Sequence, residues 1–186
     1  MMLSQDAPAD ALLERDPLAL LLGMLLDQQV PIERAFAAPY ELQRRLGHDL
    51  DAHELAGYDS DALAELFATP PALHRYPKSM ARRVQEICQA LVEGYGGEVT
   101  GLWRDVSDAQ ELLDRLVALP GYGMQKAQIF VALLGKQRSV QPAGWREVAG
   151  AFGEEGIYRS AADVTDAESL AKVREYKQQM KAAAKK

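Results

Sequence analysis

A short turn between two predicted helices constrains this chain more than any other stretch of its 186 residues. The turn is residues 120–123 (PGYG), and apolar residues at helical spacing occur before it, in 107–118, and after it, in 124–135. Proline cannot continue a helix, and glycine takes backbone conformations that other residues avoid. The sequence therefore predicts two helices joined by a tight turn.

This turn can present bare backbone N–H groups to a ligand. The second helix is expected to begin near Met124, where the first N–H groups have no partner within the helix and the helix dipole is positive. Such a corner binds phosphate without a charged side chain. The simpler interpretation is a turn that only connects two helices.

Three segments in a fixed order extend this observation. Residues 119–127 (LPGYGMQKA) are similar to the helix-hairpin-helix of DNA repair glycosylases. Residues 80–98 (MARRVQEICQALVEGYGGE) resemble the helix that ends in a Gly-Gly-Glu-like turn before that hairpin, and residues 20–29 (LLLGMLLDQQ) resemble a buried helix with a polar turn. Over roughly residues 17–150 the chain thus resembles the HhH-GPD superfamily, which includes endonuclease III-like and alkylpurine glycosylases, and its short bacterial members above all.

The predicted fold class is all-α, because no segment alternates as a strand does. The resemblance implies two lobes around a cleft, with the helix-hairpin-helix at about 107–135. We expect residues 1–15 to be a flexible lead, with docking of Leu12 and Leu13 as the alternative, and residues 16–186 to form the domain. The expected helices are 17–29, 32–46 with Pro39 as a point of division or kinking, 61–68, 80–93, 107–118, 124–135, 144–152 and 166–180, with a loop over 47–60.

The net charge of −6 argues against DNA binding, since affinity for DNA comes largely from phosphate neutralisation by Lys and Arg. Near the turn the balance reverses, because residues 120–146 contain Lys126, Lys136, Arg138 and Arg146 and no acid. A local positive field can outweigh the net charge. The simpler interpretation of these cations is a solvated surface.

The resemblance implies base excision, in which a base is flipped from the stack and the bond at C1′ of its sugar is broken. The family supplies an Asp some 15–20 residues after the hairpin. Here Gln141 lies closest to that position, and Glu147 is the only acid in the window 138–147. Glu147 is therefore a weak catalytic candidate. Its simpler interpretation is an exposed acid in the first turn of a helix.

Bifunctional members of the family use a Lys two residues after the second glycine of the hairpin. That position is Gln125, and Lys126 follows one residue later, about 100° further around the helix. We therefore expect no Schiff-base lyase activity, with water as the nucleophile. Lys126 is expected near phosphate or flanking the hairpin. The implied DNA-binding residues are Pro120, Gly121, Tyr122, Gly123, Met124 and Lys126.

Gln28 and Gln29 occupy the turn from which, in the resembled enzymes, a side chain fills the gap left by the flipped base. Gln29 fits that wedge best, and the alternative is that both glutamines cap the preceding helix. Trp145 and Tyr122 are the aromatic residues expected to meet DNA, with Trp145 as a possible base pocket. A core position for Trp145 is the alternative.

The chain contains one cysteine, Cys88, whereas an iron–sulfur cluster needs four thiolates. The histidines His48, His53 and His74 lack metal-ligand spacing, so we expect no metal and no cofactor. No apolar run approaches the ~20 residues that span a bilayer. We expect a monomer that binds double-stranded DNA in the bacterial cytoplasm, associated with the nucleoid.

The predicted function is that of a base excision repair protein, a monofunctional DNA glycosylase that flips a damaged base and hydrolyses its N-glycosidic bond. The alternative is a non-catalytic protein that binds damaged or branched DNA and has lost the catalytic Asp. A third class, a protein–protein module, fits the negative net charge and predicts no salt-sensitive binding to DNA.

Overall fold

The chain folds into helices and loops, and the prediction of an all-α fold is confirmed. The computed structural model describes residues 1–185 and has no β-strand within them. None of the helices in this range has both the length and the apolar character needed to cross a membrane. The α-helices are α1 (Ala7–Arg15), α2 (Pro17–Leu26), α3 (Ile32–Leu46), α4 (Ala52–Gly57), α5 (Ser60–Ala68), α6 (Pro77–Tyr95), α7 (Ala109–Val117), α8 (Met124–Gln137), α9 (Trp145–Ala149) and α10 (Ala167–Ala184), with 3-10 helices η1 (Val99–Leu102), η2 (Gly150–Phe152) and η3 (Ala161–Asp163).

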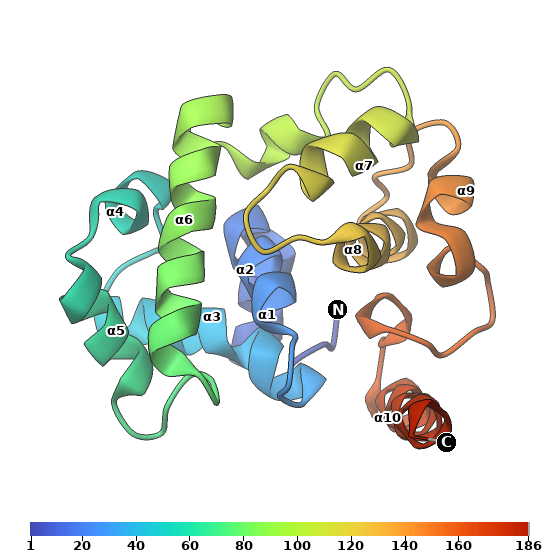
Figure 1. Cartoon of the computed structure of the whole chain (residues 1–186), viewed down its shortest axis with the longest axis horizontal. Helices are drawn as coiled ribbons and strands as arrows, with labels where there is room; N and C mark the ends of the chain where they lie inside the picture. Colours follow the sequence, from blue (N-terminus) through green and yellow to red (C-terminus); the bar gives the residue numbers. More distant parts are fainter. Residues whose placement is uncertain (186) are drawn as a thin grey trace.

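Helix α2 is the centre of the molecule. Every residue from Leu18 to Leu26 is buried, and Figure 1 shows α2 lying between α6 and α8. A helix that is apolar on all sides must be covered on all sides, and α2 contacts α1, α3, α6, α8 and η1. The other elements are therefore positioned relative to α2.

Two groups of helices lie on either side of α2 (Figure 1). In one group α6 packs against α4 and α5, and in the other α8 packs against α7, α9 and η3. The turn between α7 and α8 lies where the second group meets α2. This arrangement places the helix-hairpin-helix at the boundary between the two groups.

Residues 1–15 pack onto the domain and do not form the flexible lead that we expected. Leu12 and Leu13 of α1 are buried, and Leu3 before the helix is completely buried. Asp6 caps α1 by accepting a hydrogen bond from the backbone N–H of Ala9. Burial of three leucines, at roughly 1.5–3 kcal/mol each, outweighs the tendency of a chain end to remain unfolded.

Several boundaries differ from those expected. Helix α2 ends at Leu26, before the two glutamines, and α3 continues through Pro39 without a break. Helix α4 lies within the expected loop; Asp51 caps it and Leu55 anchors it in the core. Helix α6 begins at Pro77, since proline is favoured in the first helical position.

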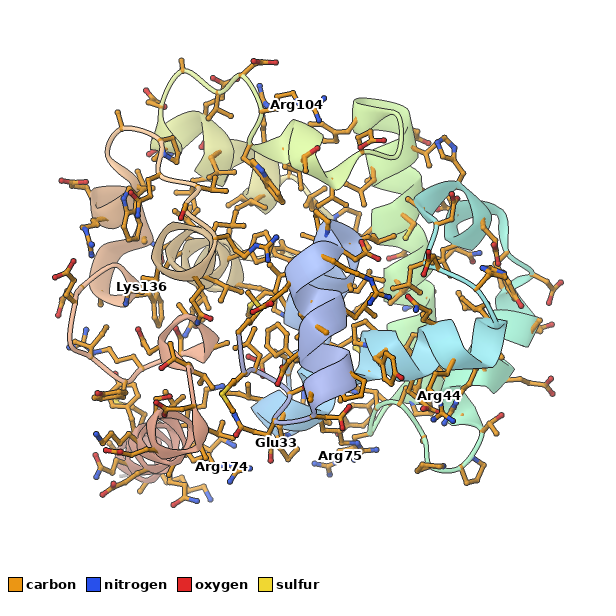
Figure 2. All side chains as sticks on the ribbon, turned by 180° about the vertical axis from the view of Figure 1, so that it is seen from behind. Glu33, Arg44, Arg75, Arg104, Lys136 and Arg174 are labelled. Atoms are coloured by element: carbon orange, nitrogen blue, oxygen red, sulfur yellow. The ribbon has the colours of Figure 1, made fainter. Side chains whose placement is uncertain are left out.

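Beyond its buried residues, α10 is fastened by ion pairs. The buried residues of α10 all lie in its first two turns. Beyond them Arg174 pairs with Glu33 at the start of α3, and Figure 2 shows these two side chains next to each other. Nζ of Lys177 lies 3.7 Å from Oδ2 of Asp27 at the end of α2. Two contacts between charged groups therefore connect α10 with the first half of the chain.

Candidate nucleic-acid interface

The turn between α7 and α8 directs its larger side chains inward and its backbone outward. Leu119 and Tyr122 are buried, whereas Gly121 and Gly123 are exposed. Gly121 has a φ of +81°, and a Cβ atom at this position would lie 2.5 Å from Cδ1 of Leu25. Glycine is therefore needed here both for the backbone conformation and for the close approach to α2.

The first turn of α8 offers N–H groups to solvent. Gly123 is its N-cap, no side chain caps the helix, and no acid lies in the first turn. Gly123, Met124 and Gln125 are exposed. Because the first N–H groups of a helix lack acceptors within it and the dipole is positive there, this end has the features that a phosphate site requires.

Tyr122 anchors the turn. Its side chain is buried, its hydroxyl donates a hydrogen bond of 2.7 Å to the carbonyl oxygen of Leu21, and its ring meets that of Phe130 edge to face. Its backbone N–H donates within the turn to Leu119. The structure therefore corrects the expectation that the Tyr122 ring meets DNA: this ring attaches the turn to α2.

Lys126 flanks the hairpin on its inner side. Its Nζ donates a hydrogen bond of 2.7 Å to the carbonyl oxygen of Leu25. Burial lowers the pKa of Lys126 to about 8, and the nearby charge of Asp27 opposes that shift. Of the two places expected for Lys126, near phosphate or flanking the hairpin, the structure has the second.

Asp27 is the acid closest to this part of the hairpin, and no sequence pattern singled it out. Its side chain is only 6% exposed. Burial raises the pKa of Asp27, while the charges of Lys177 and Lys126 act in the opposite direction. The end of α2, the start of α8 and the second half of α10 thus each contribute a charged group to one cluster.

The polar turn after α2 is held by two residues from distant parts of the chain. Gln28 donates through Nε2 to the carbonyl oxygen of Leu25, and Arg83 of α6 donates to its Oε1 at 3.4 Å. Nε2 of His74 lies 3.1 and 3.0 Å from the carbonyl oxygens of Leu26 and Gln28. The N–H of Tyr76 donates to the other ring nitrogen of the same histidine, which is consistent with a neutral ring that carries its proton on Nε2.

Gln29 is the exposed member of this turn. Its φ is +57°, and its side chain is not among those that hold the turn together. Gln28 is already engaged, so Gln29 is the better placed of the two for the wedge that the resemblance implies. Sequence reasoning considered His74 only as a metal ligand and missed its contacts with this turn, because 46 residues separate it from Gln28.

Gln125 and Gln141 lie at opposite ends of α8. Gln125 is exposed in the first turn. Gln141, which lies nearest to the family's Asp position, donates through Nε2 a hydrogen bond of 2.8 Å to the carbonyl oxygen of Gly135. Its amide therefore satisfies a carbonyl group near the C-terminal end of the helix.

Trp145 and Glu147 lie on α9, away from the hairpin turn. Trp145 is buried against Gly135, which is about 16 Å along α8 from Met124. Glu147 is exposed and lines a hollow of about 330 Å³ that also contains Glu154 and Glu155. Arg146 also lines this hollow and pairs with Glu155, while Arg159 pairs with Glu154, so the hollow carries charges of both signs. The roles expected for Trp145 and Glu147 stay predictions, and neither residue contributes to the proposals below.

The cations that follow the turn in the sequence are engaged with the protein itself. Lys136 pairs with the buried Asp163 at 2.6 Å, and Arg146 pairs with Glu155. Arg138 donates to a backbone carbonyl of α1. These side chains are therefore less available to a phosphate than the backbone N–H groups of the turn are.

Within residues 1–185 no three His, Cys, Asp or Glu side chains are grouped as metal ligands would be. Cys88 is completely buried in α6, and burial raises the pKa of its thiol to about 12. The expectation of no iron–sulfur cluster continues to rest on the single cysteine of the sequence, since such a cluster needs four thiolates.

An all-α domain whose helix-hairpin-helix presents bare N–H groups defines a class of proteins suited to holding a nucleic-acid backbone. A family model described as HhH-GPD superfamily base excision DNA repair protein matches residues 22–186. The chain therefore belongs to the HhH-GPD superfamily of base excision DNA repair proteins, as its motifs predict. No curated protein matches it.

Proposed function

We propose that this protein is a monofunctional DNA glycosylase that acts on damaged bases in double-stranded DNA. It flips the base from the stack, hydrolyses the N-glycosidic bond and leaves an abasic site. The observation that carries this proposal is the exposed backbone of the hairpin turn, which Tyr122 fastens to α2 next to the polar turn of Gln28 and Gln29.

Binding begins at the hairpin. The N–H groups of Gly123, Met124 and Gln125 approach a phosphate of one strand, since none of them is used within α8. Gln29 enters the duplex at the place of the flipped base, where a polar side chain can also hydrogen-bond the base left without a partner. The protein acts as a monomer, in which one hairpin engages one duplex.

Water is the nucleophile in this proposal. Gln125 stands where bifunctional relatives of the resembled type carry a lysine, and an amide cannot form a Schiff base. The amine of Lys126 is directed to the carbonyl oxygen of Leu25. The strand therefore stays intact after the base leaves.

One observation favours a second candidate function. Gln141, at the position nearest the family's Asp, carries no charge and is engaged with the carbonyl oxygen of Gly135. A chain without a carboxylate at this position still has the exposed hairpin turn and the polar turn of Gln28 and Gln29, which suffice for recognition of DNA. The second candidate is therefore a protein that binds damaged or branched DNA without cleaving the glycosidic bond.

An excision assay separates the two. Duplexes that carry a panel of damaged bases are incubated with the protein, and each sample is divided and half is treated with alkali. Strand breaks that appear only after alkali support the monofunctional glycosylase. Salt-sensitive binding with no breaks after alkali favours the non-catalytic binder, and breaks before alkali contradict the assignment of Gln125.

The hairpin itself is tested with Gly123→Asp. Aspartate is a good N-cap, so this variant is expected to fold, yet its carboxylate occupies the place of the phosphate. We expect the affinity for duplex DNA to fall at least about tenfold. Gly123→Ala is the matched control, since a Cβ atom at this position meets nothing within 4 Å. Equal affinity of Gly123→Asp and the wild type would exclude this turn as the contact.

A further inference from the structure

Asp27 is held at the meeting point of three segments, beside the hairpin. Nζ of Lys177 in α10 lies 3.7 Å from its Oδ2, which is longer than a closed hydrogen bond. The charge of Lys126 also acts on Asp27, and the ammonium group of Lys126 donates a hydrogen bond to the carbonyl oxygen of Leu25. The positive charges of Lys177 and Lys126 therefore offset the negative charge of Asp27, and Lys177 does so without a closed hydrogen bond to the carboxylate.

Two other carboxylates, the buried Asp163 and the candidate Glu147, are less suited to catalysis. Asp163 is occupied, because Lys136 and the N–H groups of Arg159 and Ser160 all donate to it. Glu147 is exposed in a hollow at α9. Asp27 is nearly buried, as Asp163 is, but of the three it alone lies beside the hairpin and directly before Gln28.

The chemistry of base release calls for a carboxylate in this position. As the C1′–N bond breaks, its electron pair leaves with the base, and positive charge develops on the sugar. A preorganised negative charge in a site of low polarity stabilises that sugar cation. A residue adjacent to the turn that enters the duplex is close to the nucleotide that has been flipped.

We propose that Asp27 is the catalytic carboxylate of this chain, in place of the Asp that its relatives carry after the hairpin. This inference rests on the proposed function. The carboxylate of Asp27 faces C1′ and stabilises the sugar cation. The oxygen of a water molecule bonds to C1′ and its proton passes to Asp27, which returns it to solvent, while the departing base takes a proton from solvent. The sum is the addition of one water across the C1′–N bond.

Lys177 makes this site responsive to DNA. Its side chain is 41% exposed and flexible, whereas Asp27 is nearly covered. A phosphate that approaches α10 competes with Asp27 for the ammonium group of Lys177, and the carboxylate becomes available to the sugar when Lys177 moves to the phosphate.

The test uses two duplexes that contain no damaged base, so that it does not depend on which lesion is recognised. One carries a cationic pyrrolidine analogue of an abasic site, and the other carries the neutral tetrahydrofuran analogue. The cationic ring imitates the charge of the sugar in the transition state, and such analogues bind more tightly than neutral ones. We expect the dissociation constant of the wild type to be at least about tenfold lower for the cationic duplex.

Asp27→Asn is expected to remove this preference and to bind the tetrahydrofuran duplex as the wild type does. Glu147→Gln is the matched control and keeps the preference. Asp27→Glu retains the charge and is expected to keep part of the preference. Asp27→Ser, a second neutral variant, takes the place of Asp27→Asn should that variant fail to fold, and it is expected to remove the preference in the same way.

The outcomes separate this proposal from the function on which it rests. Equal binding of both duplexes by the wild type, or a preference that survives in Asp27→Asn or, when that variant does not fold, in Asp27→Ser, overturns the role of Asp27. Salt-sensitive binding of the tetrahydrofuran duplex then still supports the proposed function. The absence of salt-sensitive binding to either duplex refutes both.

Discussion

The hydroxyl of Tyr122 donates a hydrogen bond of 2.7 Å to the carbonyl oxygen of Leu21, although 101 residues separate them. Lys126 donates in the same way to Leu25, one helical turn further along α2. The carbonyl group of Leu25 is among the last four of α2, which have no N–H donor within the helix. The hairpin is therefore attached to two successive turns of α2, and this attachment sets the direction of its exposed N–H groups.

Tyr122→Phe removes the first of these bonds. The carbonyl oxygen of Leu21 is left with one donor fewer in a buried place, and we expect the free energy of unfolding to fall by about 1–2 kcal/mol. Urea denaturation followed by circular dichroism measures the change. Tyr76→Phe is the control, because Tyr76 is 42% exposed. Equal stability of both variants would show that the bond contributes nothing net.

Gly121 and Gly123 are expected to differ sharply when each is changed to alanine. Gly121→Ala places a side chain in a left-handed backbone conformation and 2.5 Å from Leu25, so a loss of about 2 kcal/mol or more is expected. Gly123→Ala has an ordinary φ and open space. Thermal unfolding of the two proteins gives the comparison, and a Gly121→Ala protein as stable as the wild type contradicts the close approach to α2.

Lys126 gives stability a pH dependence of predictable sign. Its pKa in the folded protein is about 8, below the ordinary value of 10.5, so the unfolded chain binds more protons between these two pH values. The contribution of Lys126 to stability therefore rises as the pH rises through this window. Relative to Lys126→Met, we expect the wild type to gain about 1–3 kcal/mol between about pH 7.5 and about pH 10.

Urea denaturation of both proteins at the two pH values measures this difference, and the other titrating groups cancel in the comparison to first order. A constant difference in stability would mean that the ammonium group of Lys126 is as well solvated in the folded protein as in the unfolded chain.

Cys88 is expected to be unreactive until the protein unfolds. The thiol is completely buried, and with a pKa of about 12 only about one molecule in ten thousand carries a thiolate near pH 8. A colorimetric disulfide reagent should therefore react fully in urea and hardly at all without it. Rapid reaction of the native protein would show that α6 opens easily around this residue.

The hairpin and the central helix could be predicted because their signals are local. Two glycines beside a proline define a turn in any context, and a run of leucines from Leu18 to Leu26 requires burial on all sides. The family followed from the order of such segments. The directions of Tyr122 and Lys126 could not be predicted, because they depend on carbonyl groups that are contributed by a helix far away in the sequence.

The candidate site could be predicted only in part from the sequence, again because its contacts join segments that are far apart in the chain. The resemblance implied a role for Gln28 and Gln29 but none for Asp27, which precedes them. The charges that act on Asp27, those of Lys126 and Lys177, come near it only through the fold. Docking of Leu12 and Leu13 was only an alternative to a flexible lead, and burial of Leu3 was not predicted, because a short amphipathic segment at a chain end gives a weak signal. Tertiary packing decides such segments more than local propensity does.

Salt added to this protein acts in two places at once. The Arg174–Glu33 and Lys177–Asp27 contacts that fasten α10 are electrostatic, so counterions weaken them as they weaken attraction to phosphate. A plot of affinity against ionic strength thus reports internal contacts together with those made to a nucleic acid. The number of phosphate contacts obtained by dividing the slope of this plot by the slope expected for one contact is therefore incorrect.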